Sequence, residues 1–430
     1  MHTIVPSTRA PHAICKVRTR VCRKHIMVHY EWVETISPCT LRPGLRTNHG
    51  MNPKQKRPQA SSAQKVPVER RRYKFKPDPT ANFAQNVSAR LKGDTQFLRR
   101  SVQMSFVLLS VWIGIEFYLF MRWGLSGGSE AFHSRPPGAE AFLPISGLLG
   151  LVHWQQGGEL NHVHPAATVI LVAIIGVCLL VRKSFCSWLC PVGTLGEWLA
   201  EIGKRLFRRN FVVWNWLDYP LRLLKYALLF YFICMLATMG AAALDMFVNG
   251  AYNRMADVKM YQFFAHITPR ALCIVLALAV ASVLYNRFWC RYLCPYGALL
   301  GVAGLLSPVS VTRAKDTCID CELCTRVCPS HIAVHRSGKR FGGANVGRVW
   351  SDECTTCMRC VDECPVRDTL VVRTRPWRRP LSGPVVATLV VGVFVAITAL
   401  AMASGHWSNS ITPTEYLQQF GQITVHRMAR

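Results

Sequence analysis

Five blocks of apolar residues constrain the fold of this chain more than any other feature of its sequence. Each approaches the roughly 20 residues that an α-helix needs to cross a bilayer. The blocks are Val102–Met121, Ala166–Val181, Leu221–Leu244, Arg270–Tyr285 and Pro384–Ala403. Half of the residues are hydrophobic and 17% are charged, against about 25% charged residues in soluble domains. The sequence therefore predicts a multi-span α-helical membrane protein.

The loops between these blocks differ in their content of Lys and Arg. Six basic residues follow the second block, and the stretch from Arg287 to Arg379 holds 15, whereas the loops after the first and third blocks hold two each. Basic loops stay in the cytoplasm, so we expect a bacterial cytoplasmic (inner) membrane protein with residues 122–165 and 404–430 outside. The short apolar stretch Phe142–Trp154 is expected to be re-entrant or interfacial.

The net charge of +28 raises the question of nucleic-acid binding. Residues 1–100 carry 21 Lys and Arg against 5 Asp and Glu, interleaved with Pro, Gln and Ser, and contain no nucleic-acid-binding motif. This composition predicts a disordered basic tail that lies against anionic membrane lipid, with no nucleic-acid partner. Met51 begins a stretch typical of a basic N-terminus, so a start at Met51 is an alternative that N-terminal sequencing would test.

Eight of the 18 cysteines form a doubled motif between Cys318 and Pro365. Each half has the spacing C-x2-C-x2-C-x3-C-P of bacterial ferredoxins with two 4Fe-4S clusters, in which the fourth cysteine reaches the other cluster. The spacing therefore predicts one cluster on Cys318, Cys321, Cys324 and Cys364, and a second on Cys354, Cys357, Cys360 and Cys328. Zinc is the alternative for C-x2-C pairs, but it would leave part of each motif unused. Reduced thiolates agree with a cytoplasmic location.

The chain also contains an internal repeat with an offset of 104 residues. The segment from His164 matches the segment from Thr268, so that Cys186 pairs with Cys290 and Cys190 with Cys294. Both copies run in the same direction across the predicted membrane. The repeat predicts a pseudo-symmetric pair of helical hairpins related by an axis along the membrane normal.

Each copy of the repeat ends in an aromatic-rich C-x3-C-P motif. If the span stays helical to its first cysteine, both sulfurs lie on one helix face, and the proline ends or turns the helix. The repeat would then bring Cys186, Cys190, Cys290 and Cys294 toward one point at the cytoplasmic surface. Three interpretations are open: a further iron–sulfur cluster or other thiophilic metal, redox-active thiols, or packing residues.

These features divide the chain into five parts. We expect a disordered basic tail, a membrane bundle with the C-x3-C-P repeats, a small α+β ferredoxin-like domain with two 4Fe-4S clusters, a last transmembrane helix and a short external tail. Their ranges are 1–100, 101–310, 311–375, 381–404 and 405–430.

The order of the four motifs resembles the membrane polyferredoxins of the NapH, NosR and CcoG type, over about residues 100–375. The resemblance implies a protein that passes electrons between the quinone pool and respiratory or metal-assembly partners. The chain departs from each branch: it lacks the external flavin-binding domain of the NosR type and the external immunoglobulin-like domain of the CcoG type, and it has a fifth span that the NapH type does not have.

Two kinds of ionisable residue in or near the spans are further candidates. Glu116 lies in the first block, where a carboxylate is costly and is by default a functional candidate, unless it is hydrated at the outer interface. His162, His164 and His266 lie at the outer ends of the second and fourth blocks. They are candidates for hydrogen bonds to a quinone, with interfacial caps as the alternative.

Together these features predict a membrane-bound iron–sulfur electron-transfer protein, such as the electron-transfer subunit of a quinol dehydrogenase. A quinol carries two electrons and a 4Fe-4S cluster accepts one at a time, so the bundle would deliver single electrons to a redox partner protein. The alternative is a metal (copper) reductase or assembly factor for a respiratory oxidase, with the C-x3-C-P cysteines as ligands. A structural anchor for a ferredoxin-like partner is the third possibility.

Overall fold

A computed structural model describes residues 22–28, 31–37, 78–157, 159–208, 211–336, 339–340, 346–375 and 379–428. The chain divides into two compact units, residues 1–65 and residues 66–430, which are described separately. Met51 and most of the predicted basic tail lie outside the described residues.

The first unit contains a β-hairpin. Strand β1 (Cys22–Val28) pairs antiparallel with β2 (Glu31–Ser37), with Cys22 opposite Ser37. The two stretches, CRKHIMV and EWVETIS, contain several β-branched and aromatic residues, which favour strands. The prediction of a tail without regular structure is wrong for this segment.

The second unit begins with two helices inside the range predicted to be tail. Helix α1 (Phe83–Gly93) begins with a capping box between Asn82 and Gln85. Helix α2 (Thr95–Leu125) is capped by Asp94, whose carboxylate accepts hydrogen bonds from the backbone N–H groups of Gln96 and Phe97, both at 3.0 Å. The first predicted span therefore lies within a longer helix that starts before residue 100.

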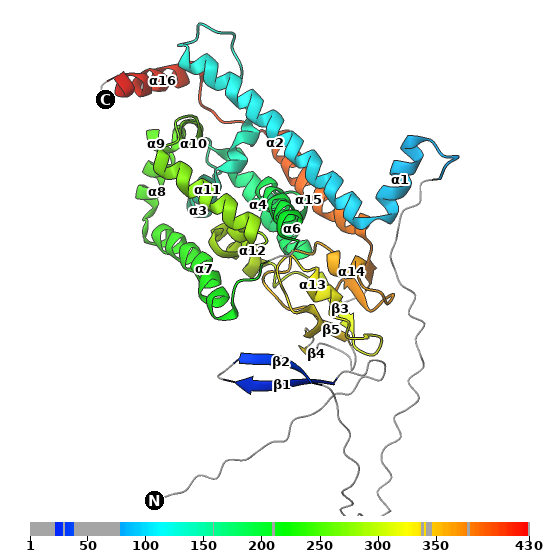
Figure 1. Cartoon of the computed structure of the whole chain (residues 1–430). Coiled ribbons are helices and arrows are strands. Elements are labelled where there is room, and N and C mark those ends of the chain that lie inside the picture. Colours follow the sequence, from blue (N-terminus) through cyan, green and yellow to red (C-terminus); the bar gives the residue numbers. More distant parts are fainter. Residues whose placement is uncertain are drawn as a thin grey trace, which may run out of the picture. The chain divides into compact units, whose positions relative to one another are not determined.

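Four helices are long and apolar enough to cross a membrane, and a bent pair supplies a fifth candidate among the described residues. The four are α2, α4 with its extension (Pro165–Trp188), most of α7 (Trp216–Thr238) and α15 (Gly383–Ala403). The bent pair joins α10 (Ala256–Ala265) to α11 (Pro269–Leu284) at 85°. The chain is a mostly helical membrane protein, as predicted (Figure 1).

The third span is shifted relative to its prediction. Helix α7 (Asn215–Thr238) ends six residues before Leu244, because the backbone is extended at Met239 and Gly240. Glycine has a low helix propensity, and a new helix, α8 (Ala241–Val248), starts directly after it. Hydropathy alone merged the two helices into one block.

The predicted re-entrant segment forms helix α3 (Pro144–Gly157), which is too short to cross a bilayer. It packs closely on α4 (Pro165–Val181) through two glycines. A Cβ at Gly147 would lie 2.7 Å from the carbonyl oxygen of Ala167, and one at Gly150 would collide with the Thr168 hydroxyl. Small residues at such positions let membrane helices approach each other.

The last helix covers one end of α2. Helix α16 (Pro413–Met428) lies in the predicted external tail. The ring of Tyr416 packs edge-on against Phe120 at 5.2 Å between centroids, and Phe420 occupies the space over Gly124. Helix α15 runs beside α2 and α4 in the bundle (Figure 1).

Short helices connect the spans. They are η1 (Pro137–Phe142), η2 (Arg182–Ser184), α5 (Phe185–Trp188), α6 (Pro191–Phe207), α9 (Ala251–Arg254), η3 (Trp289–Leu293) and α12 (Pro295–Ala303).

A small antiparallel sheet with short helices follows the bundle. The strand order is β4-β5-β3-β6-β7. Its strands are β3 (Ser310–Ala314), β4 (Lys339–Arg340), β5 (Val346–Arg348), β6 (Leu370–Arg373) and β7 (Pro380–Leu381), and its helices are α13 (Leu323–Arg326), η4 (Val334–Arg336) and α14 (Arg359–Asp362). The register sets Val311 opposite Val372 and Thr312 opposite Arg348.

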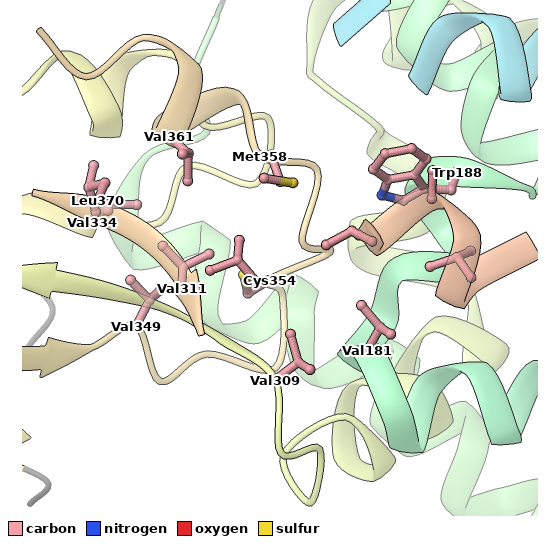
Figure 2. Packing of buried hydrophobic residues seen from close by; sticks show 14 of the residues in the cluster. Val181, Trp188, Val309, Val311, Val334, Val349, Cys354, Met358, Val361 and Leu370 are labelled. Atoms are coloured by element: carbon pink, nitrogen blue, oxygen red, sulfur yellow. The ribbon is translucent and has the colours of Figure 1, made fainter. Parts of the chain in front are cut away.

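The sheet domain and the bundle share one hydrophobic core. Trp188 and Val181 of the bundle belong to the same buried cluster as Val309, Val311 and Met358. Figure 2 shows Trp188 on the bundle side and Met358 on the sheet side of this contact. Because the two parts bury apolar surface against each other, the cysteine-rich domain is packed onto the bundle and not merely tethered to it.

Candidate functional site

The eight cysteines of the doubled motif line two small cavities in the sheet domain. Cys318, Cys321, Cys324 and Cys364 line one cavity, and Cys328, Cys354, Cys357 and Cys360 line the other. These are the two sets that the motif spacing predicts. Each set therefore combines three cysteines of one motif with the fourth cysteine of the other.

The backbone around the cysteines has the same unusual conformation in both motifs. Asp320 and Glu322, which flank Cys321, have φ of 48° and 58°. Thr356 and Met358, which flank Cys357, have φ of 47° and 59°. Left-handed conformations at non-glycine residues are uncommon and cluster at ligand sites. These strained conformations occur in both motifs, where they let the backbone form a tight loop around each cavity.

The cysteines do not converge as the ligands of one metal ion would. Among the described residues, no group of three or more His, Cys, Asp or Glu side chains is gathered closely enough to hold a single ion. Four cysteines that line one cavity without converging on a single point suit a cubane, whose iron atoms each take one thiolate. The donor set therefore fits a 4Fe-4S cluster in each cavity better than zinc.

Burial affects the chemistry of these thiols. It raises the pKa of Cys328 to about 12 and raises the pKa of Cys360 well above its usual range, and neighbouring cysteines add to both effects. Burial thus favours the neutral thiols, and iron would displace their protons on binding.

The two cavities differ in their distance from solvent and from the bundle. Cys321 is exposed, whereas Cys328, Cys354 and Cys357 are buried. The loop of the second set is bonded to the bundle: the Ser187 hydroxyl donates to the carbonyl of Thr355 at 2.7 Å. The Trp188 indole N–H donates to the next carbonyl, that of Thr356, at 3.3 Å.

The C-x3-C-P motifs adopt similar local structures in the two copies of the repeat. Cys190 caps α6 and its sulfur accepts the N–H of Gly193 at 3.4 Å, while Cys294 caps α12 and accepts the N–H of Gly297 at 3.3 Å. The proline after each second cysteine is the first residue of a new helix, a position that needs no N–H donor.

The expectation that each span stays helical to its first cysteine is wrong. Helix α4 ends at Val181, and Arg182 has a left-handed φ of 60° before the chain turns into α5. In the second copy Arg287 has a φ of 53° and Cys290 lies in a π-helical turn. Hydrophobicity continues through these turns, so the pattern alone does not reveal the breaks.

All four C-x3-C-P cysteines line one large cavity in the bundle. Its volume is about 970 Å³. Its wall is mostly apolar and includes side chains of α2, α3, α4, α7, α12 and α15, and Cys186, Cys190, Cys290 and Cys294 lie at the end next to the sheet domain. The four cysteines thus share one cavity, and their predicted convergence on a single point stays a prediction.

Each copy of the repeat places a buried cation near these cysteines. Lys183 and Arg287 occupy equivalent positions at the 104-residue offset. The Nζ atom of Lys183 lies 3.6 Å from a carboxylate oxygen of Glu353, which precedes Cys354 in the sheet domain. A guanidinium nitrogen of Arg287 lies 2.9 Å from a carboxylate oxygen of Glu197 on α6.

Glu197 joins three parts of the molecule. Its carboxylate accepts hydrogen bonds from Arg99 of α2 at 2.7 and 2.9 Å, from Arg287, and from Arg359 of α14 in the sheet domain. Burial works against the charged form, but Arg287, Arg99 and Arg359 outweigh it and hold the pKa of Glu197 far below its usual range. Sequence reasoning did not single out Glu197, because its partners come from distant segments.

The other predicted residues lie away from the cysteines. Glu116 is half-buried on α2, does not line the large cavity and has no ion-pair partner among the described residues. His164 is buried and bonded to Glu140 and to the carbonyl of Asn253. His162 lines a separate cavity of about 550 Å³, and His266 is exposed.

Two known domain families match the chain. The 4Fe-4S binding domain family matches residues 163–210 and 267–310, and the 4Fe-4S dicluster domain family matches residues 310–372. The two matches to the first family start 104 residues apart, which is the offset of the internal repeat. Iron–sulfur binding is therefore the shared property of the matched regions.

Several known proteins are similar to this chain. YccM of Escherichia coli (strain K12), whose name carries a proposed role in electron transport, is 40% identical over 335 residues, which cover 76% of this chain and 90% of YccM. The ferredoxin-type protein NapH of Haemophilus influenzae is 30% identical over 47% of this chain and 68% of NapH. The regulatory protein NosR of Pseudomonas aeruginosa is 29% identical over 43% of this chain and 25% of NosR. No solved structure matches the chain.

Proposed function

The chain belongs to the family of membrane-associated 4Fe-4S electron-transfer proteins of the NapH and NosR type that includes YccM, and from this premise we propose that it relays electrons between the quinone pool and a respiratory or other redox partner. The sheet domain would hold two 4Fe-4S clusters on the eight cysteines of the doubled motif. The four C-x3-C-P cysteines would form a third redox site, either a further cluster or a thiol pair.

The observation that carries this proposal is the order of the cysteine sites. The four C-x3-C-P cysteines lie at the end of an apolar cavity in the bundle. The second set of the doubled motif is bonded to the same end of the bundle through Ser187 and Trp188. The first set lies toward solvent, with Cys321 exposed. Together the sites connect a lipid-accessible cavity with a surface that a soluble partner reaches.

The protein would enclose the clusters, fix their positions and place charged side chains near them. When bound, a 4Fe-4S cluster accepts or gives up one electron at a time, at a potential set by its surroundings. The cysteines would hold the clusters, and the shared hydrophobic core around Trp188 and Met358 would fix the sheet domain on the bundle. Lys183 and Arg287 place positive charge beside the C-x3-C-P cysteines, where thiolates or a cluster would carry negative charge.

We place the protein in a bacterial inner membrane with the sheet domain on the cytoplasmic side. The loops rich in Lys and Arg support this orientation. The 15 cysteines between Cys178 and Cys364 are free thiols, as cluster ligands need to be. Cysteine labelling with a membrane-impermeant probe tests this orientation. A probe added on the cytoplasmic side that labels Cys273 but does not reach Cys321 would contradict it.

The proposed function is tested by reduction of the purified protein under anaerobic conditions. We expect iron and sulfide in equal amounts and an EPR signal of reduced 4Fe-4S clusters after addition of decylubiquinol or menadiol. Protein with clusters that dithionite reduces but neither quinol reduces would overturn the quinone role. Cys234→Ser is the matched control for the Cys→Ser variants described below, because Cys234 is a half-buried cysteine of α7 outside every cavity described above.

Copper handling is the competing proposal for the C-x3-C-P cysteines. Cysteine thiolates are soft ligands that suit Cu(I) as well as iron–sulfur clusters, so the residue types alone do not separate the two proposals. Stoichiometric copper in protein from metal-replete cells, lost in Cys186→Ser, would favour this alternative.

A further inference from the structure

The large cavity of the bundle has the size and lining of a site for a lipid-soluble molecule. Its volume of about 970 Å³ lies at the upper end of the range of about 300–1,000 Å³ that small-molecule sites occupy. Side chains such as Phe106 of α2, Leu229 of α7 and Phe394 of α15 form its wall. A water-soluble substrate would gain nothing from such a wall, whereas a long apolar chain would bury its whole length.

Few polar side chains interrupt this lining. Ser110 and Thr398 donate their hydroxyl groups to carbonyl groups of their own helices, those of Phe106 at 2.8 Å and Phe394 at 3.0 Å. They are therefore satisfied without a ligand. Neither is available as a specific donor to a molecule in the cavity.

The cysteine end of the cavity differs in this respect. Tyr296 lines the cavity, and its hydroxyl makes no hydrogen bond with any residue that the structure describes. Lys183 lines the cavity too; its side chain is 3% exposed, and its nearest carboxylate oxygen, on Glu353, is 3.6 Å away. Tyr296 is half-buried, so its hydroxyl is open to the cavity. Both donors line the same cavity, where either would stabilise a ligand acceptor.

We infer that this cavity is the quinone site, with the apolar tail between α2 and α7 and a head-group carbonyl oxygen accepting hydrogen bonds from Tyr296 and Lys183. The inference rests on the proposed function and adds the position and the residues of the site. A quinone combines a long apolar tail with carbonyl acceptors at one end, which matches the distribution of apolar and polar groups along the cavity. The head group lies beside Cys186 and Cys294, at the redox-active end of the bundle.

The location is tested by photolabelling of the full-length protein in detergent with an azido derivative of decylubiquinone. We expect the label in peptides 228–236 and 289–297, and protection by excess decylubiquinone. Label confined to the smaller cavity around His162 and His406 would overturn the inference. Labelling that excess decylubiquinone does not compete away would also overturn it, because such labelling reflects general partition of the probe into detergent.

The residue assignment is tested with Tyr296→Phe. Because the hydroxyl has no protein partner, the variant should keep the Tm and iron content of the wild type. With ferricyanide as the electron acceptor, we expect its KM for decylubiquinol to rise about fivefold to tenfold, as for the loss of one hydrogen bond to a ligand, with kcat changed less than twofold. Tyr231→Phe is the matched control, because Tyr231 is an exposed residue of α7 that does not line the cavity.

Lys183→Gln provides a second test. Glu353 keeps its ion pair with Lys225 in this variant, and the KM for decylubiquinol is expected to rise at least as much as in Tyr296→Phe. An unchanged KM in both variants overturns the assignment of these residues. If decylubiquinol reduces the wild type, but the photolabel lies outside the large cavity and the KM is unchanged in both variants, this inference fails and the proposed function stands. If the azido derivative of decylubiquinone labels the cavity but decylubiquinol does not reduce the protein, the proposed function fails and the binding site stands.

Discussion

A carboxylate oxygen of Glu197 lies 2.9 Å from a guanidinium nitrogen of Arg287, at the point where the bundle, a C-x3-C-P turn and the sheet domain meet. Arg99 and Arg359 contact the same carboxylate from α2 and α14. A buried carboxylate surrounded by three arginines is stable only as a set, since removal of the anion leaves the cations uncompensated.

Glu197→Gln is therefore expected to destabilise the protein by about 3–5 kcal/mol, the range for removing one partner of a buried ion pair. The measurement is the free energy of unfolding, or the Tm, of purified protein in detergent. Glu201→Gln is the control on the same helix: Glu201 is 40% exposed and pairs with Arg205 and Arg100 at the surface. The control should change stability by less than about 1 kcal/mol. Equal effects of the two substitutions would contradict the role of Glu197.

The same ion-pair set predicts a dependence of stability on pH. The pKa of Glu197 is lowered in the folded state, so its contribution is fully present above the unfolded pKa, near 4.5, and declines as the pH falls toward the folded pKa. The difference in Tm between wild type and Glu197→Gln should be constant from pH 8 to about pH 5.5 and should shrink from about pH 5 to pH 3. A difference that grows in acid would show that the carboxylate is protonated in the folded protein.

The grouping of the cysteines in two cavities predicts that a substitution in one cavity removes iron from that cavity only. Cys357→Ser and Cys321→Ser should each remove about half of the iron of the doubled motif, because each set of four cysteines would hold its own 4Fe-4S cluster under the proposed function. EPR of the reduced variants should show a single cluster without the spin coupling of a pair. Loss of all iron in Cys321→Ser would show that the two cavities do not fill independently.

The turn of the C-x3-C-P motif depends on a glycine. A Cβ at Gly193 would collide with the carbonyl oxygen of Cys186, which cannot move without displacing the cysteine. Gly193→Ala should therefore lower the Tm and impair reduction by quinol, with the iron of the doubled motif retained. Gly392→Ala is the control in α15, where a Cβ meets nothing within 4 Å; it should be neutral or stabilise the helix by up to about 1 kcal/mol.

Several features of this protein follow from the sequence because they depend on short-range order. The two sets of four cysteines around the sheet-domain cavities are those that the spacing of Cys318–Cys328 and Cys354–Cys364 predicts, since a cubane fixes the distances between its ligands. The apolar blocks locate the spans because a bilayer demands about 20 apolar residues per helix. Errors arose where helices broke within a hydrophobic stretch, at Gly240 and at Val181, because hydropathy does not change at these breaks.

The sequence alone determined the motifs, the repeat and the spans, since each is a local pattern with its own physical cause. Only the tertiary structure decided which residues surround the cysteines: Glu197 meets arginines from three distant segments, Lys183 meets Glu353 of the sheet domain, and Tyr296 lines a cavity together with side chains of distant helices. Such contacts depend on how helices pack and on charges that must find partners once buried. A spacing rule carries no information about either.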